Sequence, residues 1–252
     1  MILETTLIKG IFVFFRTLGV IITSPILGDR GFPATAKIAL ALSIAFLLTP
    51  VLNIDVPNPD SVLILILIIS REILIGVAIG LVVLFIFMGV QLAGSIMGFQ
   101  MGMWLAEMVD PTFGIEIPVI AQFNYLFAMM LFLCVNGHLM VLNAVRQTFK
   151  LLPLGTFSIT NSFTEQFLAT GSSIFRVGFE IGAPIIGVLL LISISLGLIA
   201  RAIPEFDILM SSIPLSISTG LWLMSVSLPY IAVTILKMIY NLEPNIYNLF
   251  RH

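Results

Sequence analysis

The sequence predicts an all-α protein of the integral membrane type, built from long kinked helices and helical hairpins. Of its 252 residues, 59% are hydrophobic and only 10% are charged, whereas charged residues make up about a quarter of an ordinary soluble domain. The mean hydropathy is +1.17. Long apolar runs alternate with short stretches rich in glycine, proline and charge, and these linkers are too short to hold a soluble domain.

The apolar runs define the expected helices in order. The first follows Glu4 and contains Lys9 and Arg16, which favours a retained helix over a cleaved signal peptide. The third would be about 68 Å long as one helix, far more than the bilayer core of about 30 Å, so we expect a helix that extends beyond the bilayer. The runs are residues 7–27, 36–52, 61–105, 117–143, 163–202 and 208–240.

The charges flanking these runs conflict with an ordinary alternating topology. If residues 61–105 cross once, the acidic stretch from Glu107 to Glu116 falls inside and the basic pair Arg146 and Lys150 falls outside. This arrangement reverses the positive-inside rule. We therefore expect helices that do not follow simple alternate crossing.

Glycines spaced four residues apart indicate close helix packing. This small-xxx-small spacing lets helix backbones approach each other in membranes. The alternative interpretation is that glycine is simply frequent in membrane helices. The expected packing positions are Gly76, Gly80, Gly94, Gly98, Gly102, Gly178 and Gly182.

Ionisable residues inside the apolar runs should face protein or water rather than lipid. Arg71 and Glu72 are adjacent and point in different directions, so each needs a partner elsewhere. Snorkelling to an interface is an equal alternative for Arg16 and for Lys237. The expected buried polar residues are Arg16, Arg71, Glu72, Glu107, Arg201, Glu205 and Asp207, and Arg176 with Glu180 form a possible pair within one helix.

The stretch from Gly98 to Pro118 is the strongest candidate for a functional segment. It places three carboxylates and a proline-containing turn between two very apolar runs. Such a segment survives at membrane depth only where protein encloses it or where it lines an aqueous path. Its methionines suit changing contacts, although they are also ordinary core fillers. They are Met101, Met103 and Met108, with Met97 directly before the stretch.

No catalytic motif, cofactor motif or metal-ligand spacing is present in the sequence. His138 is read as a hydrogen-bonded residue at a helix break, and Cys134 as a small buried hydrophobe. We therefore expect no enzyme, no cofactor and no metal. The acids Glu107, Asp110, Glu116, Glu205 and Asp207 leave a proton-coupled small-solute transporter as the alternative, although no inverted repeat supports it.

Several motifs in order resemble the FliR/SctT family of type III secretion export-gate subunits, and its flagellar branch in particular. They cover nearly the whole chain. The chain departs from the family pattern at Pro204-Glu205-Phe206-Asp207, where Pro-Gln-Met-Asn is common, and at Ser216, where lysine is common. The motifs are Arg16 to Pro33, Ser70 to Gly76, Gln91 to Gly102, Asp110-Pro111-Thr112 with Gly114, Asn136 to Leu139, and Leu196 to Pro204.

The resemblance implies one copy of this chain in an export gate with several copies of FliP and FliQ, together with FlhB and FlhA. The location would be the bacterial inner membrane, within the flagellar basal body. Residues 1–155 would be FliP-like and include a plug loop over 98–118, and residues 156–252 would form a FliQ-like hairpin and tail. The plug would seal the channel for unfolded flagellar proteins through Met101, Met103, Met108, Asp110, Pro111, Phe113 and Gly114.

Overall fold

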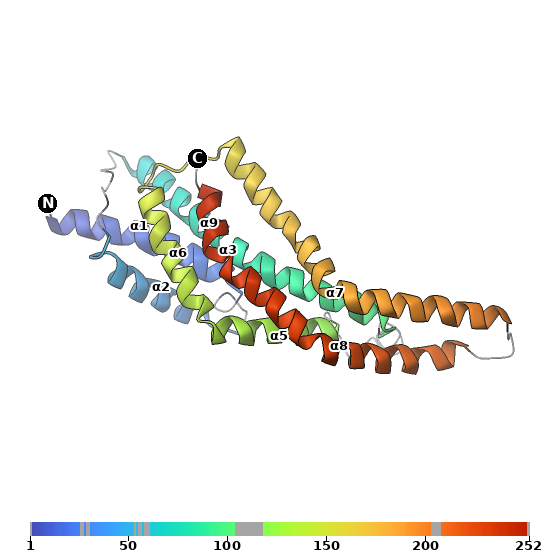
Figure 1. Ribbon diagram of the computed structural model, residues 1–252. Helices are drawn as coiled ribbons and strands as arrows, with labels where there is room; N and C mark the ends of the chain where they lie inside the picture. The colour runs from blue at the N-terminus through green and yellow to red at the C-terminus, as the bar shows by residue number, and fades with distance from the viewer. Residues whose placement is uncertain are drawn as a thin grey trace. The chain divides into compact units, whose positions relative to one another are not determined.

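Every regular element of the protein is an α-helix in the computed structural model, which describes residues 2–25, 28, 31–52, 54, 57, 61–103, 118–202 and 208–250. Across those ranges no strand occurs, which confirms the predicted all-α class (Figure 1). The helices are α1 (Ile2–Thr23), α2 (Ala34–Leu48), α3 (Val62–Gln100), α5 (Val119–Cys134), α6 (Gly137–Leu151), α7 (Asn161–Ala202), α8 (Ile208–Tyr240) and α9 (Leu242–Phe250).

Four helical stretches in the described ranges are long and apolar enough to cross a membrane, or up to five if a bent pair counts as one. They lie in α1, in α3, in α7 and in Ser212–Phe250. Helix α3 has 39 residues and continues through Arg71 and Glu72, so the longest apolar run is one helix as predicted. Asn136 separates α5 from α6 with a left-handed φ of 57°, which places a helix break where the sequence predicted one.

The chain divides into two compact units. The first contains Met1–Phe85, Val135–Ser172 and Ile239–His252, and the second contains Ile86–Cys134 and Ser173–Met238. Within the first unit α2 packs beside α1, and α9 packs beside α6 (Figure 1). Helices α3 and α7 each contribute one part to each unit.

Glycines hold α1 against α3 in the first unit. A Cβ added at Gly76 would collide with the carbonyl oxygen of Arg16, and one at Gly80 would collide with the hydroxyl of Thr23. On the opposite helix, a Cβ at Gly19 would lie 2.7 Å from the carbonyl oxygen of Ile73. The backbones themselves therefore limit how close the two helices lie, and side chains larger than hydrogen do not fit between them.

Glycines also allow close contacts between helices in the second unit. A Cβ at Gly94 of α3 would lie 2.5 Å from the Cα of Ala121 in α5. Gly89 and Gly178 form a second contact, between α3 and α7, where added Cβ atoms would lie 2.6 Å from Val177 and 3.0 Å from Leu92. The nearest atom to a Cβ at Gly182 belongs to Ile186 of its own helix.

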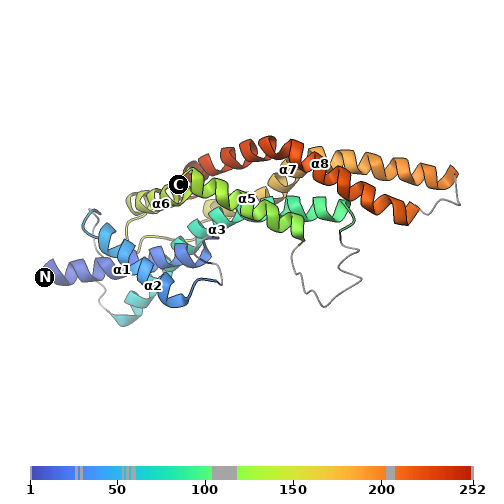
Figure 2. The same cartoon turned by 90° about the horizontal axis from the view of Figure 1, so that it is seen from below.

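A proline inside α7 leaves one backbone carbonyl without its helical donor, and a tyrosine on α8 donates a hydrogen bond to it. Pro184 lies inside α7, and because proline has no N–H it leaves the carbonyl of Glu180, four residues earlier, without its helical donor. The hydroxyl of Tyr230 donates to that carbonyl oxygen over 3.2 Å. In both views this part of α8 runs alongside α7 (Figure 2).

Because Gly76 contacts the backbone of α1, we expect a single methyl group added at this position to destabilise the fold. Gly76→Ala should lower the free energy of unfolding by about 1–3 kcal/mol, because backbone atoms on α1 cannot rotate away from the new Cβ. The measurement is thermal or denaturant unfolding of the purified protein in detergent. Gly187→Ala is the matched control, since nothing lies within 4 Å of its added Cβ. Equal unfolding midpoints for the two variants would contradict the proposed backbone contact.

Candidate functional site

The side chains of Arg16 on α1 and Glu72 on α3 form a fully buried ion pair. Both side chains have 0% exposure, and Arg16 Nε donates to Glu72 Oε2 over 2.6 Å. Burial of Arg16 excludes the snorkelling interpretation for this residue, whereas Lys237 is exposed. The charge of Arg16 is thus compensated inside the protein rather than at a membrane surface.

The remaining polar atoms of this pair contact helix α6 and the segment after it. Arg16 donates through one terminal nitrogen to the Leu152 carbonyl over 3.2 Å and through the other to Thr148 Oγ1 over 3.5 Å. Its guanidinium carbon lies 4.0 Å from the centre of the Phe149 ring. Such a set of partners, including a cation–π contact, is what a buried guanidinium requires.

The side chains of Arg71 and Glu72 both form hydrogen bonds with the backbone of Gly155. The N–H of Gly155 donates to Glu72 Oε1 over 3.0 Å, and Arg71 donates to the carbonyl of Gly155 over 2.8 Å. Gly155 has a φ of +76°, and a Cβ there would lie 3.3 Å from Ile68. These are the partners that the sequence required but did not identify, and they fix the chain where it leaves α6.

A Schellman motif ends helix α3 within the first residues of the expected plug loop, residues 98–118. The N–H of Met103 donates to the carbonyl of Gly98 over 3.2 Å, and the N–H of Gly102 donates to that of Phe99 over 3.0 Å. Gly102 has a φ of +79°, which glycine adopts without steric cost. Among the described residues nothing lies within 4 Å of a Cβ added at Gly102, so there the backbone conformation rather than packing requires glycine.

Met101 anchors the same end of α3 against α8. Its side chain is fully buried, and a Cβ added at Gly220 would lie 2.6 Å from Met101 Cε. Gly220 therefore provides the space that the thioether occupies. On the other side of the segment, Pro118 Cβ would be 3.6 Å from a Cβ at Gly98. The chain thus leaves α3 and returns before α5 at neighbouring points.

Part of the predicted site can be located. Met103 is half-buried in the turn after α3. Arg71 and Arg201 are exposed, and Arg176 and Glu180, both within the described ranges, do not form an ion pair. Sequence reasoning missed Gly19, Gly89 and Gly220, for which the only available signal was a glycine within an apolar helix. The residues outside the described ranges are Glu107, Met108, Asp110, Pro111, Phe113, Gly114, Glu205 and Asp207.

The described residues contain no group of three or more His, Cys, Asp or Glu that could hold a metal ion. Cys134, expected to be buried, is exposed. The described residues thus form two structural features. The first unit contains the charge network of Arg16 and Glu72, and the second contains the capped end of α3 beside Met101.

Comparison with known proteins places the chain in a family. Residues 7–242 match the family of bacterial export proteins, family 1. The chain belongs to this family. Members similar to it include a flagellar biosynthetic protein FliR of Escherichia coli K12, 36% identical over 86% of this chain and 83% of the relative. Another flagellar biosynthetic protein FliR, from Bacillus subtilis 168, is 29% identical over 88% of this chain and 87% of the relative.

A third such relative comes from Aquifex aeolicus VF5 and is 27% identical over 92% of this chain and 89% of its own length. These matches confirm the family resemblance that the sequence motifs indicated. Together with the long apolar helices, membership makes this protein a membrane-embedded bacterial export protein, family 1.

The ion pair predicts strong coupling between Arg16 and Glu72. Arg16→Met or Glu72→Gln alone should cost about 3–5 kcal/mol of unfolding free energy, because each leaves a buried charge without its partner. The double variant should cost less than the sum of the two. Thermal unfolding of the four proteins measures this, with Arg201→Met as an exposed-arginine control. Strictly additive single effects would exclude the coupling.

Proposed function

We propose that this protein is a core subunit of the flagellar type III protein export gate, and that it helps to form and seal the channel for unfolded flagellar proteins. The observation that carries the proposal is the family match over residues 7–242, together with relatives whose names assign them to flagellar biosynthesis. The partners would be FliP and FliQ, and in the wider apparatus FlhB and FlhA. The location would be the bacterial inner membrane, at the flagellar basal body.

The proposed seal is the segment over 98–118. Its described boundaries support a movable element between fixed ends: the Schellman motif at Gly102 stops α3, Met101 is held against Gly220, and Pro118 lies beside Gly98. A segment with fixed ends can change position without unfolding the helices that carry it. Methionine side chains would fit many substrate sequences because they are flexible and polarizable. The proposed plug residues are Met101, Met103, Met108, Asp110, Pro111, Phe113 and Gly114.

The proposed assembly also accounts for the apolar surface of α7. In the most apolar window of this helix only 11% of the residues are buried within the chain. Neighbouring subunits or lipid would cover the rest. In this arrangement residues 1–155 are the FliP-like part and 156–252 the FliQ-like hairpin and tail. The protein acts by assembly and gating, with no chemical step.

The transporter alternative has no comparable support. Its acids Glu107, Asp110, Glu116, Glu205 and Asp207 all lie outside the described residues. The relatives described above are named as flagellar biosynthetic proteins, and none is named as a solute transporter.

Co-purification tests the proposed assembly. Expressed with FliP and FliQ of the same bacterium, the tagged protein should elute from size-exclusion chromatography as one stable hetero-oligomer. Native mass spectrometry should find a single copy of this chain in it. The proposal is rejected if the protein stays monodisperse and uncomplexed and, reconstituted alone, transports a small solute.

Deleting part of the segment tests the proposed seal. Removal of residues 104–113 leaves the Schellman motif in place, so the complex should still form, while ion leakage through reconstituted complexes should rise severalfold. Replacing the same residues with an equal length of glycine and serine is the matched control for chain length. It should leak too, because the tether remains but the sealing side chains are gone. Unchanged leakage from both assembled variants would count against the plug.

A further inference from the structure

A cationic cleft lies between α6 and α9 in the first unit. Its volume is about 410 Å³, and its lining comes from both helices. Residues from α6 form most of it, and Tyr247 of α9 forms the opposite side. The lining residues are Asn143, Arg146, Gln147, Lys150, Leu151 and Tyr247.

Two cations four residues apart provide the charge of the cleft. Arg146 and Lys150 lie on the same face of α6 and are exposed, whereas the opposite face of that helix buries Val145 and Phe149. Among the described residues neither cation forms an ion pair. Lys150 lies in the last turn of α6, where it also complements the helix dipole, but Arg146 lies a turn earlier and has no such role.

One carboxylate is hydrogen-bonded to a residue that lines the cleft. Glu243 of α9 accepts a hydrogen bond from the side-chain amide of Asn143 over 2.9 Å. Asn143 thus holds the carboxylate at one side of the cleft, while Arg146 and Lys150 stand one and two helical turns further along. The cleft keeps a net positive charge, with the amide of Gln147 as a further donor.

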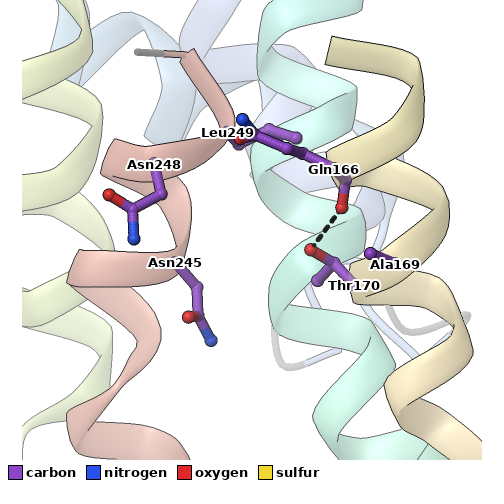
Figure 3. A pocket seen from close by; sticks show the side chains of 6 residues that line it. All are labelled: Gln166, Ala169, Thr170, Asn245, Asn248 and Leu249. Atoms are coloured by element: carbon purple, nitrogen blue, oxygen red, sulfur yellow. Dashed lines mark hydrogen bonds between the residues drawn. The ribbon is translucent and has the colours of Figure 1, made fainter. Parts of the chain in front are cut away.

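The cleft on the other side of α9 shows that this charge is local. It has a similar volume of about 430 Å³ and lies between α9 and α7. Figure 3 shows Asn245 and Asn248 on α9 and Gln166 and Thr170 on α7 among its lining residues. Its six lining residues are all uncharged. Both sides of α9 are therefore polar, but only the side toward α6 carries cations.

We propose that the cleft between α6 and α9 binds a phosphate group, supplied by the headgroup of an anionic membrane lipid. Arginine and lysine with neighbouring amide donors are the usual ligands of phosphate oxygens. Basic pockets between helices of membrane proteins bind phospholipid headgroups, and the apolar Leu151 with the ring of Tyr247 suits the junction of headgroup and acyl chain. The proposal does not depend on the gate function.

The test measures lipid binding by the full-length protein. Purified protein is titrated with phosphatidylglycerol or phosphatidylcholine in detergent, and native mass spectrometry and the unfolding midpoint report binding. The test variant is Arg146→Gln with Lys150→Gln. The matched control, Arg176→Gln with Lys237→Gln, removes the same two charge types from exposed positions outside the cleft. Inorganic phosphate and polyglutamate are titrated in parallel.

Phosphatidylglycerol should bind and raise the unfolding midpoint more than phosphatidylcholine does. The cleft variant should bind it about ten- to thirtyfold more weakly, as expected for two cations near an anionic lipid, while the control variant should match the unsubstituted protein. Binding of inorganic phosphate without a preference for phosphatidylglycerol would assign the phosphate to a soluble source and overturn the lipid proposal. Binding of polyglutamate alone would assign the cleft to an acidic protein segment, and equal lipid binding by all variants would exclude the site.

Discussion

The rest of the first unit depends on the burial of one positive charge. A guanidinium removed from water costs several kcal/mol unless its partners are well placed, and the partners of Arg16 come from α3, α6 and the segment that follows α6. The backbone of the same residue meets Gly76, one turn beyond Glu72. Charge pairing and helix contact therefore select the same register between α1 and α3. A shift of either helix would break both at once.

Both units contain close glycine packing, but among the described residues only the first adds a buried charge network. In the first, hydrogen bonds from Arg71 and Glu72 hold the backbone at Gly155. In the second, close packing prevails, with Gly94 against Ala121 and Met101 beside Gly220. Apolar packing is non-directional, whereas hydrogen bonds to charged groups fix particular atoms against each other. The described boundaries of the candidate plug, Met101 and Pro118, lie in the second unit.

Sequence reasoning reached the all-α class, the single helix α3 and the need of Arg71 and Glu72 for partners, because these follow from composition, length and charge. It did not identify the partners, since Thr148 and Leu152 are 132 and 136 residues from Arg16 along the chain. Spacing assigned Gly102 to packing, whereas its positive φ places it in a helix cap. Glycine spacing does not distinguish close approach from a left-handed backbone. Gly220 has no glycine four residues away, so the spacing rule did not select it.

The hydrogen bond from Tyr230 to the Glu180 carbonyl has a mechanical consequence for the hairpin of α7 and α8. Pro184 leaves this oxygen without a donor from its own helix. Sliding α8 along α7 by a single residue rise, about 1.5 Å, would carry the phenol away from the acceptor. This hydrogen bond therefore favours one register of α8 along α7 near Pro184. A shift of one helix along the other would cost this hydrogen bond and leave the Glu180 carbonyl without a donor.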